Sequence, residues 1–163
     1  GNFERDINLV RIDGLFPCPF LNNHSPALRV AEKAGYKTTL YHQMGVSPWQ
    51  DSAEDPLALD RFGDGSFLLQ LFIRGNPFSG NLFNKEPWLS TIQQLQKANR
   101  LSGIILYGSP FFWNEIKTVL DQSIPCAFSP GQMNAAQNHV LLSLLQTKQD
   151  IKMKDFQLMQ FTD

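Results

Sequence analysis

Hydrophobic and polar residues alternate along the chain in two kinds of segment. Short apolar or alternating stretches, typical of strands, lie at residues 7–12, 36–42, 66–73, 103–107 and 124–128. Between them, apolar residues recur at three- and four-residue spacing, typical of amphipathic helices, at residues 26–34, 87–99, 110–121 and 132–146. Strands separated by helices predict a mostly parallel sheet with helices on both of its faces.

Several local signals support these boundaries. Ser25 and Pro26 provide an N-cap followed by a proline at the first helical position, and Gly35 provides a helix stop. Ser109 precedes Pro110 in the same way, so Ser109 is predicted to cap the helix that follows residues 103–107. Residues 66–73, SFLLQLFI, are almost all apolar, which predicts a central strand covered on both faces.

The remaining segments are less regular. Residues 44–64 predict a long loop with one helical turn at residues 56–61, and the Gly, Pro and Asn residues of 74–81 predict another loop. In the last helix, an inward stripe is expected from Met133, Ala136, Val140 and Leu144. The tail FQLMQF, residues 156–161, is expected to form an edge strand or to pack against the domain.

The predicted fold is therefore a single α/β domain, residues 1–163. We expect a three-layer sandwich, flavodoxin- or Rossmann-like, with a mostly parallel sheet of five or six strands. A chain of 163 residues is long enough for one core of this kind.

The composition of the chain limits the classes of partner that it is expected to bind. Fourteen basic and fifteen acidic residues give a formal net charge of −1, so no basic field favours nucleic acid or a membrane surface. No apolar run approaches the ~20 residues that cross a bilayer.

Cys18 and Cys126 form no CxxC pair and are expected to be buried thiols. Because the chain starts at Gly1 without a leader, we expect a fragment of a larger cytoplasmic protein.

The carboxyl ends of the strands are the place to look for a site, because ligands of open α/β sheets bind there. The candidates for ligand or domain contacts at these ends are Arg74, Asn76, Tyr107, Ser109, Ser129 and Gln132. Arg74 is the most informative, since it places a guanidinium directly after the most apolar strand. The favoured interpretation is that Arg74 ties neighbouring loops together, through backbone carbonyls or a carboxylate.

The sequence offers no catalytic constellation. It has no Gly-rich phosphate motif, and Ser109 is followed by proline instead of the spacing of a nucleophile elbow. His24, His42 and His139 are scattered, which argues against a metal site, and nothing beyond His24 and His42 makes Cys18 a nucleophile. We therefore predict no catalytic residue, no metal and no cofactor.

One acidic segment needs a choice between two interpretations. The segment carries five carboxylates: Asp51, Glu54, Asp55, Asp60 and Asp64. Two of them could act as the acid/base pair of a glycosidase, but a solvated polar loop is the favoured interpretation. Trp49 in the same segment could stack on a sugar or anchor the loop on the core.

Several longer motifs resemble one family. They are NLVRIDGLFPCPFL with HSPAL and AGY, then LLQLFIRGNPFSG at residues 68–80, ILYGSPFFW at 105–113 and IPCAFSPGQMNAAQ at 124–137. In combination they resemble the C-terminal α/β domain of glycoside hydrolase family 3, in particular cyanobacterial proteins related to β-N-acetylhexosaminidases. Relatives tend to have FSYGQMP where this chain has FSPGQMN, so any contact of that tyrosine is lost here.

The resemblance implies a two-domain parent protein. Its N-terminal (β/α)8 barrel would hold the sugar, an aspartate nucleophile and, in the hexosaminidase branch, a histidine acid/base. Members with glucosidase activity take a glutamate from the second domain, but no matching motif surrounds Glu54, Glu86 or Glu115. The chain is thus expected to be a non-catalytic accessory domain that packs against the barrel, with residues 74–80 near the substrate entrance.

Two other classes of function stay open at this point. One is a stand-alone flavodoxin-like domain that binds a small ligand or nucleotide at residues 107–109 and 129–132. The other is a protein-interaction module whose apolar segments GLFPCPFL and NPFSGNLF dock a partner through Phe16, Phe20, Phe78 and Phe83.

Overall fold

The computed structural model describes residues 6–12, 21–41, 47–52, 54–73 and 87–160, without the side chains of residues 40–41 and 148–160. The elements, in chain order, are β1 (Ile7–Ile12), α1 (Pro26–Lys33), β2 (Lys37–Tyr41), the 3-10 helix η2 (Leu59–Phe62), β3 (Phe67–Ile73), α3 (Trp88–Lys97), β4 (Leu101–Gly108), α4 (Pro110–Val119), β5 (Cys126–Ser129) and α5 (Asn134–Gln160).

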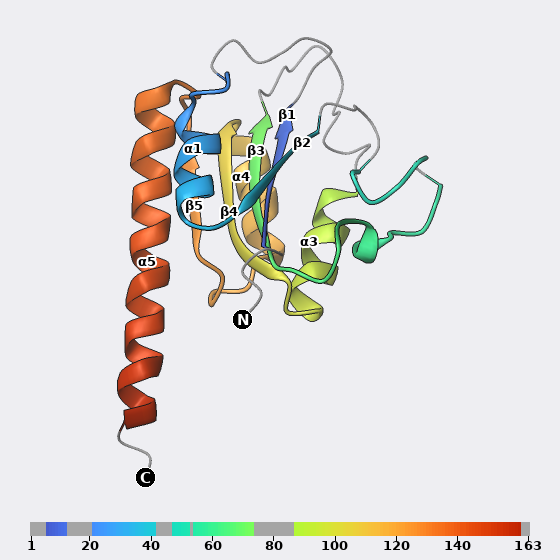
Figure 1. Ribbon diagram of the computed structural model, residues 1–163. Helices are drawn as coiled ribbons and strands as arrows, with labels where there is room; N and C mark the ends of the chain where they lie inside the picture. Colours follow the sequence, from blue (N-terminus) through green and yellow to red (C-terminus); the bar gives the residue numbers. More distant parts are fainter. Residues whose placement is uncertain (1–5, 13–20, 42–46, 53, 74–86, 161–163) are drawn as a thin grey trace.

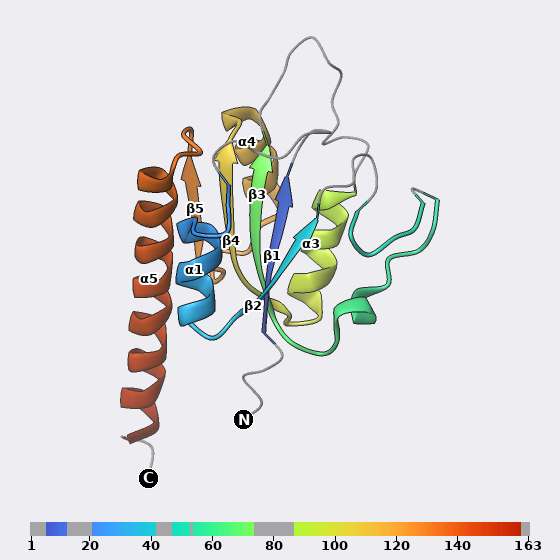
Figure 2. The same cartoon turned by 45° about the horizontal axis from the view of Figure 1, so that its top comes forward.

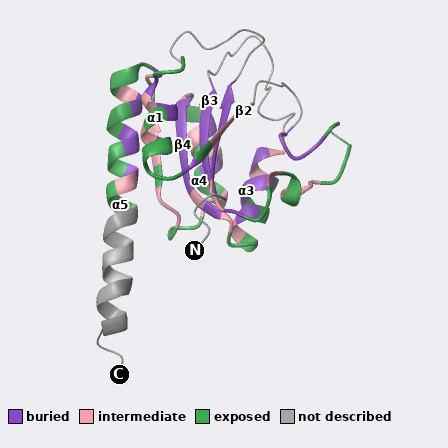
Figure 3. Cartoon of the chain, in the orientation of Figure 1, coloured by how far each residue is buried: buried purple, intermediate pink, exposed green. Residues whose placement is uncertain are grey.

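The strands form one five-stranded sheet in the order β2-β1-β3-β4-β5, and every neighbouring pair is parallel. Helices α1 and α5 cover one face and α3 and α4 cover the other (Figures 1 and 2). The predicted three-layer α/β sandwich is therefore confirmed. Strand β3 lies in the middle of the sheet and all of its residues are buried, as its continuous apolar sequence predicted (Figure 3).

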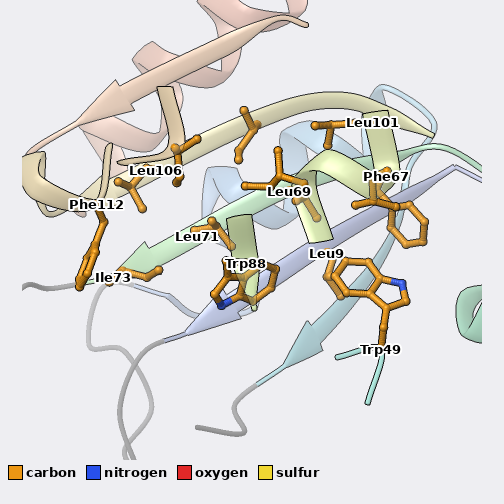
Figure 4. Close-up of a cluster of buried hydrophobic side chains, with 14 of the residues drawn as sticks. Leu9, Trp49, Phe67, Leu69, Leu71, Ile73, Trp88, Leu101, Leu106 and Phe112 are labelled. Carbon is orange, nitrogen blue, oxygen red and sulfur yellow. The ribbon is translucent and has the colours of Figure 1, made fainter. Parts of the chain in front are cut away.

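One core fills the space between the sheet and helices α3 and α4 (Figure 4). Trp88, Ile92 and Leu95 of α3 face the sheet, as their helical spacing predicted. Trp49, from the long segment before η2, completes this core and is fully buried. The predicted helical turn exists, but it is the 3-10 helix at Leu59–Phe62.

A second core lies under α1 and α5. Ala27 and Ala31 of α1, together with Leu141 and Leu144 of α5, pack against the other face of the strands. A Cβ atom on Gly103 of β4 would lie 3.2 Å from the Leu144 side chain, so this glycine lets α5 approach the sheet closely.

The ends of α1 show how the predicted signals act. Gly35, at φ 100°, ends the helix as predicted: its N–H bonds to Glu32 and the N–H of Tyr36 bonds to Ala31, the two bonds of a Schellman motif. Ser25 occupies the N-cap position, but its hydroxyl makes no capping bond and instead accepts from the Asn22 N–H at 2.8 Å.

Three expectations about residues 126–160 need correction. Residues 156–160 do not form the edge strand, because α5 continues to Gln160, and the alternative that they pack against the domain concerns side chains that the structure does not describe. No Gly or Pro interrupts the chain after Gln146, and extending an existing helix adds a hydrogen bond per residue without needing a partner strand. Met133 precedes the helix and is 59% exposed, so it is no part of the inward stripe. Cys126 is exposed at the start of the edge strand β5, not buried.

Candidate functional site

The carboxyl edge of β4 and β5 brings together four of the six candidate residues. Gln132 donates from Nε2 to the Tyr107 carbonyl at 3.1 Å, and the Ser129 hydroxyl accepts from the Gly131 N–H at 3.1 Å. The Ser109 hydroxyl accepts from the Phe112 N–H at 3.4 Å, so Ser109 caps α4 as predicted. Arg74 and Asn76 lie outside the described residues. A ligand or domain contact by any of the six stays a prediction.

Tyr107 has its backbone at this edge but its side chain in the second core. The ring stacks on Phe72 with 4.3 Å between centroids, and the hydroxyl donates to Gln70 Oε1 at 2.8 Å. Burial raises the pKa of the Tyr107 phenol, so the hydroxyl stays protonated and remains a donor. Tyr107 therefore presents only its main chain to the edge.

The hydrogen bond of Tyr107 belongs to a buried circuit, which we call the amide circuit: Asn8, Ala27, Gln70, Tyr107, Gln132 and Gln137. Gln70 Nε2 donates at 2.7 Å both to Asn8 Oδ1 and to the Ala27 carbonyl. The Asn8 amide donates to the same carbonyl at 2.9 Å and to the Thr38 hydroxyl at 3.1 Å. The circuit thus fastens the first turn of α1 to the middle of the sheet.

The circuit closes through the GQMNAAQ segment. Gln137 Oε1 accepts from the Ala27 N–H at 3.0 Å, and Gln137 Nε2 donates to the Gln132 carbonyl at 2.9 Å. Helix α5 therefore satisfies a free N–H of the α1 N-terminus, a bond that a cap residue usually makes. Both glutamines of the segment are engaged within the domain, and both are buried.

Arg11 is a buried charge that sequence reasoning did not single out. It lies near the carboxyl end of β1, is 2% exposed, and donates from Nη1 to the Ile12 carbonyl. A charged side chain is rarely buried without partners, because removing it from water is costly. The sequence does contain a signal that could have identified Arg11: it is the single charged residue within the apolar strand INLVRI.

In the described part of the chain, Trp49 and the acidic residues of its segment do not assemble into a sugar-binding or glycosidase site. Trp49 anchors its segment, with edge-to-face contacts to Phe67 at 5.4 Å and Trp88 at 6.1 Å between centroids, and is too buried to stack on a sugar from solvent. Asp51 pairs with Arg61 at 3.0 Å, and Asp55 accepts from the Ser52 N–H at 2.9 Å. Both carboxylates therefore have structural partners.

A metal site and a reactive thiol are the remaining kinds of site to consider. Among the described residues, no group of three or more His, Cys, Asp or Glu side chains could hold a metal ion. Cys18 and His42 fall outside those residues. Desolvation raises the pKa of the Cys126 thiol despite the opposing charge of Lys117, so this cysteine is not an activated thiolate.

Parallel strands in the order β2-β1-β3-β4-β5, with helices on both faces, define a flavodoxin-like α/β domain. The family model of the bacterial glycosyl hydrolase family 3 C-terminal domain matches residues 1–146. The chain therefore belongs to this family, as its motifs indicated. A search of curated proteins found no match. No helix in the described ranges is long and apolar enough to span a bilayer.

Proposed function

We propose that this domain is the non-catalytic accessory part of a β-N-acetylhexosaminidase or a β-glucosidase-like enzyme. Its partner would be an N-terminal (β/α)8 barrel of the same parent chain, which would carry the catalytic residues. The observation that carries the proposal is the family match over residues 1–146. It is supported by the amide circuit, which uses the side chains of Tyr107 and Gln132 to hold the domain together.

The carboxyl edge is the surface that we infer to contact the barrel. Phe111, in the first turn of α4, is 55% exposed, and Met133, just before α5, is 59% exposed. Both follow neighbouring strands, β4 and β5, at the same edge of the sheet. Large apolar side chains that stay in water at one edge favour a protein contact. Residues 74–80 directly follow β3 and would belong to the same contact.

The cytoplasm is the proposed location of the parent protein. Cys126 is exposed and unpaired in the described part of the chain, a state that a reducing compartment maintains.

The isolated chain is expected to show no turnover of a chromogenic β-N-acetylglucosaminide, whereas the parent with its barrel hydrolyses it. The physical reason is that no acid, base and nucleophile converge in the described residues. Release of the chromophore is measured for both proteins at equal concentration. Turnover by the isolated chain would overturn the proposal.

Replacing both apolar side chains of the edge tests the contact surface. With Phe111→Ser and Met133→Ser together, binding of this domain to a separately produced barrel is expected to weaken about 100-fold, because each side chain contributes about 1.5 kcal/mol or more when buried. Leu142→Ser is the matched control, since Leu142 is 54% exposed on α5. Equal affinities of the double variant and the control, measured by calorimetry, would exclude this surface.

A further inference from the structure

Strand β2 lies at one edge of the sheet, and within the described ranges it pairs with β1 alone (Figure 2). The Lys37 N–H bonds to the Asp6 carbonyl at 2.8 Å, so residues 37, 39 and 41 direct their main-chain groups to β1. Thr38 and Leu40 alternate with them and direct theirs to the outer side. The Thr38 N–H and carbonyl bond to no residue that the structure describes. Open main-chain groups of this kind are a template for another strand.

The sequence of β2 lacks the features that protect an edge strand. Proteins prevent edge pairing with prolines, bulges or charges within the strand. β2 has no proline and no register shift, and its single charge is its first residue, Lys37. The other edge strand, β5, has four residues and is bounded by Pro125 and Pro130. β2 is therefore the less protected of the two edges.

A cleft of about 490 Å³ lies beside β2, on the face of the sheet that carries α3 and α4. Lys37 and Thr39 line it from the strand, Ile7 lines it from β1, and residues 61–64 line it from the other side. Among the described residues, the connection from β2 to β3 supplies only the 3-10 helix η2, whereas each of the other three crossovers supplies an α-helix. The face beside β2 thus lacks the cover that the other strands have.

The cleft offers a fixed apolar wall and free polar groups. The Phe62 ring meets Trp49 edge to face at 6.2 Å between centroids, and Arg61 donates to Asp51 at 3.0 Å. The Lys37 ammonium and the Thr39 hydroxyl make no hydrogen bond or ion pair with any part of the chain that the structure describes. Such a surface fits a side chain that has an apolar body and a polar tip.

We propose that β2 pairs antiparallel with β2 of a second copy of this chain, about a two-fold axis at Thr39. The pairing joins the two five-stranded sheets into one continuous sheet. Thr38 then lies opposite Leu40 of the second copy, and each such pair exchanges both N–H···O=C bonds. Thr39 lies opposite its own copy, and Thr–Thr pairs across strands are favourable. The contact is isologous, as two-fold symmetry requires.

The second copy supplies a side chain that suits the cleft. In this register, position 41 of the second copy lies opposite Lys37, which lines the cleft, and the sequence has a tyrosine at position 41. Its ring would cover Phe62 and attract the Lys37 ammonium, while its hydroxyl meets the polar groups. The two Lys37 residues are four positions apart along the strands, about 13 Å, so they do not repel each other at physiological salt.

A contact of this length predicts a weak dimer, with a dissociation constant of about 10–100 µM. Sedimentation velocity of the full 163-residue chain should therefore show a reversible monomer–dimer equilibrium. Thr38→Pro is expected to raise the dissociation constant about 30-fold or more, because it removes an outward N–H from each copy, and an edge strand tolerates proline on its open side. Thr38→Ala keeps this N–H and is the matched control, with the affinity of the unmodified chain.

Cysteine cross-linking tests the register itself. On the axis, the two Thr39 residues form a pair without hydrogen bonds, with Cα atoms about 4.5 Å apart, within the range of a disulfide. Thr39→Cys is expected to give a covalent dimer with oxidised glutathione, whereas Lys37→Cys, whose two copies lie far apart, is not. Both variants also carry Cys126→Ser, because Cys126 is exposed.

Three results would overturn the proposal: a monomer at concentrations up to about 500 µM, a dimer that Thr38→Pro does not weaken, or equal cross-linking of the two cysteine variants. The second result would assign self-association to another surface, such as the exposed Phe111 and Met133. Circular dichroism verifies that the variants are folded, and the cysteine pair tests the register even where Thr38→Pro does not fold. The proposal is independent of the proposed function, since no turnover is measured.

Discussion

Gly108→Ala is expected to destabilise the domain by about 4 kcal/mol or more. Gly108 ends β4 at φ 128°, and a Cβ atom there would lie 2.1 Å from the Ile73 carbonyl oxygen and 2.9 Å from its carbon. Neither group can move aside easily, because the Ile73 carbonyl accepts the Ser109 N–H at 2.9 Å and belongs to the central strand. The substitution therefore forces β3 and β4 apart at the carboxyl edge.

Gly35→Ala is the matched control for this prediction. Gly35 also has a positive φ, 100°, but a Cβ atom there would meet nothing within 4 Å. Its replacement should cost only the backbone strain, about 1–2 kcal/mol. The free energy of unfolding is measured by denaturant titration for both variants. If Gly108→Ala costs no more than Gly35→Ala, the clash with Ile73 is not what makes this glycine necessary.

The fold was predictable from the sequence because local patterns and global packing agree. The continuous apolar run of β3 can be accommodated only where both faces of a strand are covered, and it lies in the middle of the sheet. Gly35 ends α1 by a bond pattern that depends on a few neighbouring residues alone. Signals of this kind require no knowledge of the rest of the chain.

The amide circuit could not be predicted, because its partners are far apart in the sequence. Ala27 and Gln137 are 110 residues apart, and Gln137 has the same chemistry as a solvent-facing glutamine of any helix. Tyr107 shows a related difficulty. Its position at a strand end suggested a side chain at the edge, but side chains alternate along a strand and this one points into the second core.

Four of the six candidate residues lie at the carboxyl edge, and the other two, Arg74 and Asn76, fall outside the described residues. Sequence reasoning predicted a site at the edge where Ser109 and Ser129 lie at the ends of neighbouring strands, and their role there stays a prediction.

Sequence reasoning did not find the cleft that Lys37 and Arg61 line beside β2. These two residues come from separate segments, which the packing of Phe62 against Trp49 and the hydrogen bonds of Arg100 to Leu59 and Gly65 hold together.

Gln70→Leu is expected to cost about 3 kcal/mol, since it leaves the buried Tyr107 hydroxyl and Asn8 Oδ1 without the partners they have in the circuit. Leucine has a similar volume, so the loss would come from unsatisfied polar groups more than from a cavity. Gln96→Leu is the control: Gln96 also makes two hydrogen bonds, to Val119 and Asp121, but it is half-buried and water can replace them, so its loss should cost about 1 kcal/mol or less.

A double-mutant cycle then isolates the bond between Gln70 and Tyr107. Tyr107→Phe in the Gln70→Leu background removes the hydroxyl that has lost its acceptor, so the double variant should be about 1–2 kcal/mol more stable than the sum of the two single effects predicts. Denaturant unfolding of the four proteins gives this coupling energy. Purely additive effects would mean that the hydroxyl finds another acceptor when Gln70 is absent. In that case the amide circuit would hold α1 through Asn8 and Gln137, without a contribution from β4.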